Sequence, residues 1–131
     1  MTQIRISQAA RLLGVSDDTV RRWVDGGLVT HSVDQAHRIV VDGADLADYA
    51  QSQAAIIPDP SGVGRSARNA LPGLVTRVVS DTVMSQVELL CGGFRIVALM
   101  STEAVRELGL ETGSVAVAVV KATNVIVETP A

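Results

Sequence analysis

Ser66-Ala67-Arg68-Asn69 is followed by Leu71-Pro72-Gly73 and, near the end of the chain, by Lys121-Ala122-Thr123. These stretches carry hydroxyl, amide and cationic groups, whereas the sequence between them is mostly apolar and rich in valine. The sequence between them predicts one short helix over 102–108. The pattern also predicts five strands, over 74–79, 83–90, 94–100, 115–120 and 124–127.

The strand spacing indicates how this part of the chain folds. Valines in 115–119 alternate with Ala116 and Ala118, which suits tight packing on both faces of a strand. Gly92-Gly93 separates two predicted strands, and Gly109 ends the predicted helix. Five short strands with one helix favour an OB-like five-stranded β-barrel over residues 65–131.

The same motifs carry a family resemblance. The 66–69 and 71–73 stretches, the 102–108 helix with Gly109, and Lys121-Ala122-Thr123 closely resemble the molbindin (Mop) domain of the TOBE superfamily, over roughly residues 64 to 129. Members of that family bind molybdate or tungstate, so the resemblance implies such a ligand, with molybdenum entering only as its oxyanion. It also implies a site between subunits of a homo-oligomer, either a hexamer built as a trimer of dimers or a dimer.

The chemistry of such a ligand decides which groups matter. A tetrahedral dianion without a proton needs hydrogen-bond donors and positive charge, which hydroxyls, backbone N–H groups and lysine supply. Ser101 would add donors at the start of the short helix, where the dipole favours anions. Ala104 stands where the family often has a hydroxyl residue, so only its N–H remains; Arg68 alternatively pairs with a carboxylate across a subunit contact. The implied set is Ser66, Ala67, Arg68, Asn69, Ser101, Ala104, Lys121, Ala122 and Thr123.

Residues 1–53 predict a second, helical unit. Ser7 is expected to cap a first helix, which Gly14 ends by accepting a left-handed backbone. Ser16 is expected to cap a second helix over 17–25. Small and aliphatic residues on their facing sides let the two helices approach closely, as a helix-turn-helix requires: Ala10, Leu13, Val20, Trp23 and Val24.

A β-hairpin is predicted after these helices. Two short strands, 28–30 and 38–41, flank a polar turn at 34–37. Asp42 with Asp45 then predicts the capped start of a third helix.

These motifs also resemble a known family. The run Ala9 to Ser16, then Thr19-Val20-Arg21-Arg22-Trp23, then His37-Arg38, resembles the MerR/excisionase-type winged helix-turn-helix domain. In that family the second helix enters the major groove and the wing holds backbone phosphates. The resemblance implies double-stranded DNA as a partner, contacted by Ser16, Thr19, Arg21, Arg22, His37 and Arg38.

Residues 54–64 predict a linker, because prolines and glycines recur there without apolar periodicity. The expected fold class is therefore α+β with two domains, 1–53 and 65–131. A lone cysteine, Cys91, excludes an intramolecular disulfide and is expected to be buried. The longest apolar run, 115–120, is too short to span a bilayer, and no signal peptide is evident. A cytoplasmic protein without a membrane partner is expected.

Charge and composition limit the function. The net charge is −3, and residues 1–56 carry five Arg against seven Asp, hence −2. Any DNA contact must therefore depend on a local basic face rather than on overall charge. His31 and His37 have no clustered Cys or carboxylate beside them, which argues against a metal site. No nucleophile–base grouping, phosphate-binding glycine loop or cofactor fingerprint is present, so an enzyme is not expected.

Three functions remain open at this stage. The first is a molybdenum-responsive DNA-binding transcriptional regulator. The second is a molybdate storage or buffering protein whose N-terminal domain does not bind DNA, which the acidic balance and Asp17-Asp18 favour. The third is an excisionase-like architectural protein whose barrel only oligomerises and binds no oxyanion.

Overall fold

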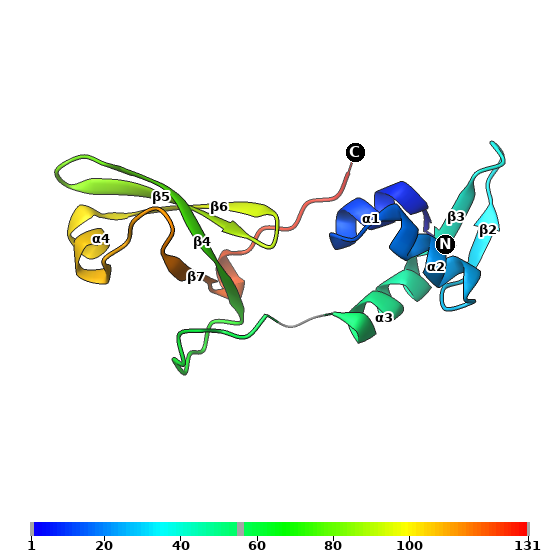
Figure 1. Cartoon of the computed structure of the whole chain (residues 1–131), viewed down its shortest axis with the longest axis horizontal. Coiled ribbons are helices and arrows are strands. Elements are labelled where there is room, and N and C mark those ends of the chain that lie inside the picture. The colour runs from blue at the N-terminus through cyan, green and yellow to red at the C-terminus, as the bar shows by residue number, and fades with distance from the viewer. Residues whose placement is uncertain (1, 55–56, 131) are drawn as a thin grey trace. The chain divides into compact units, whose positions relative to one another are not determined.

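The computed structural model describes residues 2–54 and 57–130 (Figure 1). Met1, Ala131 and two residues of the expected linker, 55 and 56, lie outside the described residues. The chain divides into two compact units, Met1–Ile56 and Ile57–Ala131.

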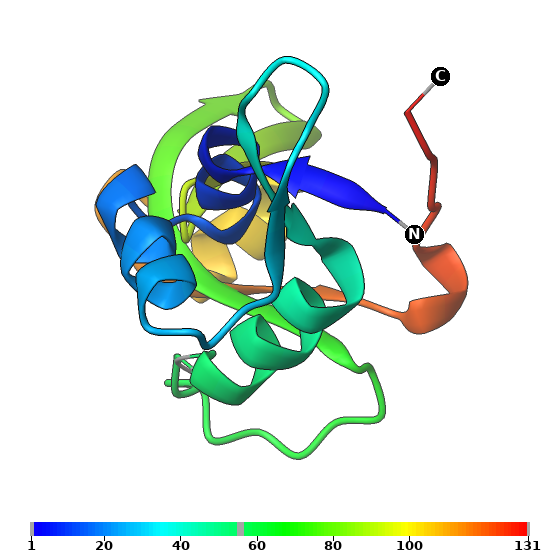
Figure 2. The same ribbon diagram turned by 90° about the vertical axis from the view of Figure 1, so that its right-hand side faces the viewer.

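The first unit packs helices against a small antiparallel sheet. Its core is aliphatic, with Val20, Val29 and Val41 at most 2% exposed. Figure 2 shows the hairpin of the two later strands, in cyan, projecting from the helices. The helices are α1 (Ile6–Leu13), α2 (Asp17–Asp25) and α3 (Gly43–Gln53), and the strand order is β1 (Gln3–Arg5), β3 (Ile39–Asp42), β2 (His31–Val33).

The predicted turn between the first two helices is confirmed, but the first cap is wrong. Gly14 ends α1 with a φ of 67°, and Ser16 caps α2 by accepting a hydrogen bond from the Thr19 N–H at 3.2 Å. Ser7 caps nothing, because α1 starts one residue before it, at Ile6. Strand β1, which pairs with β3 and was not predicted, leads directly into this helix.

The first strand of the hairpin lies three residues later than predicted. The Leu28 N–H donates to the Trp23 carbonyl at 2.9 Å, which holds the expected strand 28–30 against the end of α2. Thr30 is then tied to α3, since its N–H donates to the Asp45 carboxylate at 3.2 Å. Pairing with β3 therefore begins only at His31.

At the start of α3, one of the two contacts expected of a capping pair forms and the other does not. The Asp42 carboxylate accepts a hydrogen bond from the Asp45 N–H at 3.1 Å, as an N-cap does. The Asp45 carboxylate does not reach back to Asp42, because it binds Thr30 instead. This contact joins α3 to the hairpin.

The second unit is a curled antiparallel sheet with one short helix. Strands run in the order β6 (Phe94–Ser101), β5 (Met84–Cys91), β4 (Asn69–Ser80), β7 (Val115–Val120), and α4 (Thr102–Leu108) follows β6. Figure 1 shows the long strand β4 crossing the sheet, with α4 at one end of it. The core of this unit joins the sheet to α4 and consists of Val75, Val87, Leu89, Cys91 and Val105.

The predicted fifth strand, 124–127, is wrong for a single chain. Residues after β7 form a short 3-10 turn, η1 (Ala122–Asn124), and the tail then leaves the sheet (Figure 1). Ile126 and Val127 are each 85% exposed, because no strand of the same chain lies beside them. The described residues therefore form an open four-stranded sheet instead of a closed five-stranded barrel.

Candidate functional site

Two of the three predicted oxyanion segments meet at one end of the sheet. Asn69 opens β4 and pairs with Val120, the last residue of β7. The Asn69 side-chain amide also donates to the Val120 carbonyl at 3.1 Å. Since Ser66 lies three residues before Asn69 and Lys121 directly follows Val120, this pairing places segments 66–69 and 121–123 side by side.

Both segments present donors to solvent. The Ser66, Arg68, Lys121 and Thr123 side chains are exposed. Ala122 begins η1, in which the Asn124 N–H donates to the Lys121 carbonyl at 2.9 Å. The first N–H groups of such a turn have no partner within it, so those of Ala122 and Thr123 can face a ligand.

Arg65, which the sequence analysis did not single out, fixes the loop that precedes Ser66. Its guanidinium contacts the Asp59 carboxylate at 3.0 Å and the Ser61 hydroxyl at 2.6 Å, and its side chain is only 18% exposed. Hydrogen bonds from Ser61, together with the Arg65 charge, hold the pKa of Asp59 below its usual value. This turn could have been predicted from sequence, because an aspartate two residues before a serine is a common turn pattern.

The third predicted cluster lies elsewhere. Ser101 pairs with Met84 at the far end of the sheet, and Figure 1 shows α4 and η1 at opposite ends of it. Strand β4, which runs between those ends, has 12 residues, a path of roughly 40 Å at about 3.3 Å each. One chain therefore does not bring Ser101 and Ala104 to segments 66–69 and 121–123.

The expected donor at Ala104 is already used within the chain. The Ala104 N–H donates to the Ser101 hydroxyl oxygen at 3.1 Å, so Ser101 is the N-cap of α4. The hydroxyl proton of Ser101 remains to be donated to a ligand.

A buried chain of hydroxyl groups sets the position of this helix start. The Ser85 hydroxyl lies 2.7 Å from that of Ser80 and 2.8 Å from that of Thr102. Thr102 also donates to the Asp81 carbonyl at 2.8 Å. Because Ser85 and Thr102 are at most 3% exposed, these bonds satisfy polar groups that would otherwise cost stability.

Five of the six predicted DNA-contact residues fall into two groups. Ser16, Thr19 and Arg22 are joined by side-chain hydrogen bonds along α2: the two hydroxyls lie 2.9 Å apart, and Arg22 donates to Thr19 at 3.2 Å. These bonds hold the arginine along the helix. They also leave most of its donors available.

The second group surrounds an open hollow between α1, α2 and the hairpin. Arg21 and Arg38 both line it, and its volume is about 260 Å³. Below, this space is called the arginine hollow; its other lining residues are Arg5, Ile6, Ser7, Asp17 and Ile39.

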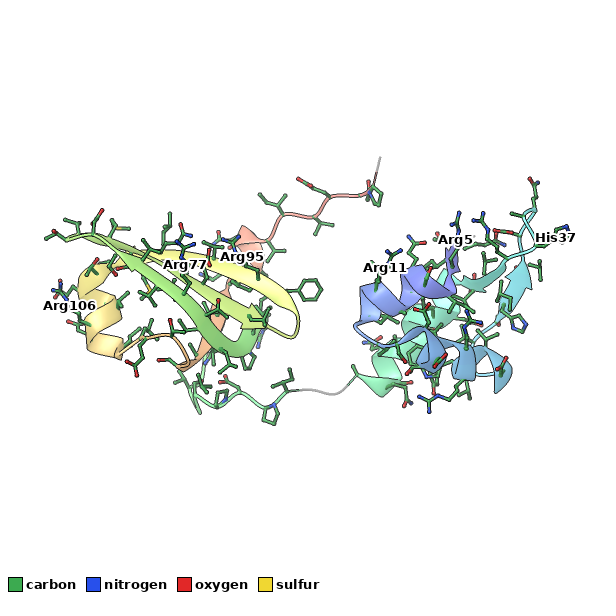
Figure 3. The ribbon with its side chains drawn as sticks, turned by 45° about the horizontal axis from the view of Figure 1, so that its top comes forward. Arg5, Arg11, His37, Arg77, Arg95 and Arg106 are labelled. Atoms are coloured by element: carbon green, nitrogen blue, oxygen red, sulfur yellow. The ribbon has the colours of Figure 1, made fainter. Side chains whose placement is uncertain are left out.

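The hairpin turn is shaped by one carboxylate. Asp34 accepts hydrogen bonds from the Ala36 and Arg38 N–H groups, both at 2.9 Å, and its second oxygen lies 3.4 Å from Arg38 Nε. The Arg38 N–H is the largest cause of the lowered pKa of Asp34. His37 stands at the tip with a φ of 60° (Figure 3).

Other reactive side chains are structural. Trp23 packs edge-on against Tyr49, with ring centroids 5.0 Å apart. Burial raises the pKa of the Cys91 thiol, which contacts the Leu71 carbonyl at 3.4 Å.

Among the residues that the structure describes, no helix has the length and apolar character needed to cross a bilayer.

Comparison with known families matches both halves of the chain. The TOBE domain profile matches residues 65–127, and a helix-turn-helix domain profile matches residues 4–54. Molybdenum-pterin-binding protein 2 of Clostridium pasteurianum is 40% identical over 63 residues, which cover 47% of this chain and 93% of that protein.

Two solved structures resemble the chain as well. A molybdate-binding protein from Sporomusa ovata aligns with a TM-score of 0.50 and 33% identity, covering 51% of this chain and all of that one. The cytoplasmic molybdate-binding protein ModG, solved with molybdate bound, aligns with a TM-score of 0.52 and 34% identity, covering 70% of this chain and 74% of that one.

Proposed function

Since the chain belongs, through its C-terminal half, to the molbindin (Mop) family of TOBE domains, we propose that it binds molybdate or tungstate and regulates transcription by binding double-stranded DNA. The observation that carries the oxyanion part is the pairing of Asn69 with Val120, which gathers segments 66–69 and 121–123. The matched helix-turn-helix domain supports the DNA part.

The gathered groups suit a dianion. Ser66 and Thr123 offer hydroxyls, Lys121 offers a compact positive charge, and backbone N–H groups complete the donor set. Charge-assisted hydrogen bonds of this kind are about twice as strong as neutral ones. The donor set matches what an unprotonated oxyanion requires.

A complete site would need a second copy of the chain. Because Ser101 lies at the opposite end of the sheet, its hydroxyl can join the other donors only from a neighbouring subunit. The exposed apolar tail at Ile126 and Val127 is consistent with self-association, since burying such side chains is favourable. A hexamer built as a trimer of dimers, or a dimer, would provide this arrangement.

Oxyanion binding and DNA binding would be coupled through assembly. An oxyanion held between subunits favours the assembled state by its differential affinity for it. An assembly carries several helix-turn-helix units, which raises its affinity for DNA with repeated sites. We propose the cytoplasm as the location.

The rival is a storage or buffering protein. The excess of acidic over basic residues in 1–56 favours it, and so do Asp17 and Asp18 in the first turn of the helix that would enter DNA. A gel-shift with DNA from upstream of the protein's own coding sequence separates the two. A regulator shows a salt-sensitive shift that responds to molybdate, and a storage protein shows no shift in either condition.

Two measurements test oxyanion binding directly. Titration calorimetry with molybdate, tungstate and sulfate should give heat with the first two and little with the third. Native mass spectrometry, with and without molybdate, should show an assembly that carries the ion. Heat equal to that of buffer for all three oxyanions would leave only an architectural role.

A further inference from the structure

We propose that Arg5, together with Arg21 and Arg38, binds one phosphate of the DNA backbone in the arginine hollow. This inference rests on the proposed DNA binding and assigns a contact residue outside the predicted set. It also gives Asp17, the single carboxylate that lines the hollow, a role in weakening that contact.

Sheet geometry places two of the arginines together. Arg5 is the last residue of β1 and pairs with Val40 of β3. Arg38 lies two residues before Val40, so it is the diagonal neighbour of Arg5 on the same face, with backbones roughly 7–8 Å apart. Side chains as long as arginine reach across that separation.

Helix geometry brings the third arginine and the carboxylate. Asp17 and Arg21 are four residues apart on α2, which places them on one face of the helix. Both line the hollow together with Arg5 and Arg38. The four side chains therefore come from three elements and carry a net charge of +2 before DNA binds.

The arginines are suited to a phosphodiester. Asp34 lies closest to Nε of Arg38, which leaves the terminal nitrogens of that guanidinium for another acceptor. Arg5 is exposed, so its guanidinium is open to a ligand. Planar guanidinium groups donate in pairs to phosphate oxygens, and a backbone phosphate contact fixes the register of a DNA-binding unit.

The hollow lies between the two elements expected to touch DNA. One wall is the start of α2, and the other is the turn end of the hairpin, at Arg38 and Ile39. A phosphate held there would lie between a groove-entering helix and a wing. Asp17 would repel that phosphate, which lowers the strength of DNA binding.

The test is the salt dependence of DNA binding by the full chain, measured as fluorescence anisotropy of a labelled random-sequence duplex. Losing one phosphate contact reduces the slope of log affinity against log salt by about 0.9. Because Arg21 and Arg38 remain beside the phosphate, Arg5→Ala should show part of that reduction, and Arg5→Lys, which keeps the charge, should retain most of the wild-type slope. The matched control is Arg11→Ala, which removes an exposed arginine at the other end of α1 (Figure 3).

Substitution of Asp17 provides a second, independent test of the proposal. Asp17→Asn should increase DNA affinity, and the increase should shrink in the Asp17→Asn, Arg5→Ala double variant because the two side chains act on the same phosphate. Unchanged melting curves by circular dichroism exclude a folding effect. Inorganic phosphate at matched ionic strength tests for a free-anion site, and phosphate that binds only chains with Arg5 but leaves their DNA affinity unchanged would overturn the proposal.

The outcomes separate this inference from the proposed function. If the wild-type chain binds no DNA even at low salt, the regulatory function fails and this contact fails with it. If the wild-type chain binds but Arg5→Ala keeps the wild-type slope, or loses no more than Arg11→Ala, only the arginine hollow is refuted.

Discussion

Gly73 is the residue at which the sheet leaves no room for a side chain. A Cβ there would lie 2.5 Å from the Leu90 carbonyl oxygen and 2.6 Å from the Cys91 Sγ. Leu90 is fixed in the β4–β5 ladder, so relief requires backbone movement. We expect Gly73→Ala to destabilise the second unit by about 1–3 kcal/mol, the usual cost of overpacking.

The measurement uses the single tryptophan of the chain, Trp23, whose fluorescence reports on the first unit. Far-ultraviolet circular dichroism reports on both units. Gly73→Ala should lower the denaturation midpoint seen by circular dichroism and leave the fluorescence transition unchanged. Gly64→Ala is the matched control, because a Cβ there meets nothing within 4 Å. Equal midpoints for the two variants would show that the sheet accommodates the methyl group.

Lys121 is the residue on which oxyanion affinity should depend most. It directly follows the Asn69–Val120 pair and is exposed, so removing its charge should leave the fold intact. Lys121→Ala should weaken molybdate binding about tenfold or more, as expected for the loss of one charge-assisted hydrogen bond. Calorimetry measures this. Lys121→Arg should bind more tightly than Lys121→Ala, and equal affinities for the three proteins would remove Lys121 from the site.

At the scale of the element, two serines were predicted to cap helices α1 and α2, and only Ser16 does so. The Ser16 hydroxyl oxygen accepts the Thr19 N–H, whereas Ser7 lies inside the first turn of α1. Ser16→Ala should therefore cost the first unit about 1 kcal/mol. Ser7→Ala should cost much less. The Trp23 fluorescence midpoint in urea measures both, and the cap assignment fails if the two variants lose equal stability.

The β5 strand carries a carboxylate that predicts a pH dependence. Glu88 is 8% exposed, and its pKa is lowered chiefly by a hydrogen bond from Arg95 and by that residue's charge, with smaller effects of Gln86 and Arg77. Figure 3 shows Arg77 and Arg95 on one face of the sheet. A carboxylate with a lowered folded-state pKa stabilises fully above its unfolded pKa, and that stabilisation is lost as the pH falls through the folded value.

The sheet should therefore lose stability as the pH falls below about 4.5, the ordinary glutamate pKa. Glu88→Gln should be less stable at neutral pH and should show a shallower acid dependence by circular dichroism. Some dependence should remain, because N–H groups of Met84 and Val83 also lower the pKa of Asp81. Parallel curves for the two proteins would contradict a role for this ion pair.

Local chemistry explains which elements were predictable. Gly14, Ser16 and Gly109 act within a few residues of themselves, so their turns and caps follow from sequence. The strand at 28–30 failed because the end of α2, at Trp23, and Asp45, which lies 15 residues from Thr30, hold those residues. The same limit applies to the site: sequence named segments 66–69 and 121–123, but only the β4–β7 register shows that they meet and that Ser101 lies apart.

At the scale of the whole molecule, the proposed function requires that the binding of molybdate and the binding of DNA be thermodynamically coupled. If molybdate raises the affinity for DNA by some factor, DNA must raise the affinity for molybdate by the same factor. The Lys121→Ala protein should bind DNA like the wild type when molybdate is absent and should lose the molybdate response. Arg22→Ala should weaken DNA binding and leave calorimetric molybdate affinity unchanged when DNA is absent, because its contacts lie within α2.

Anisotropy titrations of DNA with and without molybdate, and molybdate titrations with and without DNA, measure both sides of that linkage. Two equal factors, both lost in Lys121→Ala, would mean that one assembly equilibrium serves both ligands. A DNA affinity that does not respond to molybdate, in a chain that binds both, would mean that its two units act independently. The protein would then bind an oxyanion and DNA without sensing one through the other.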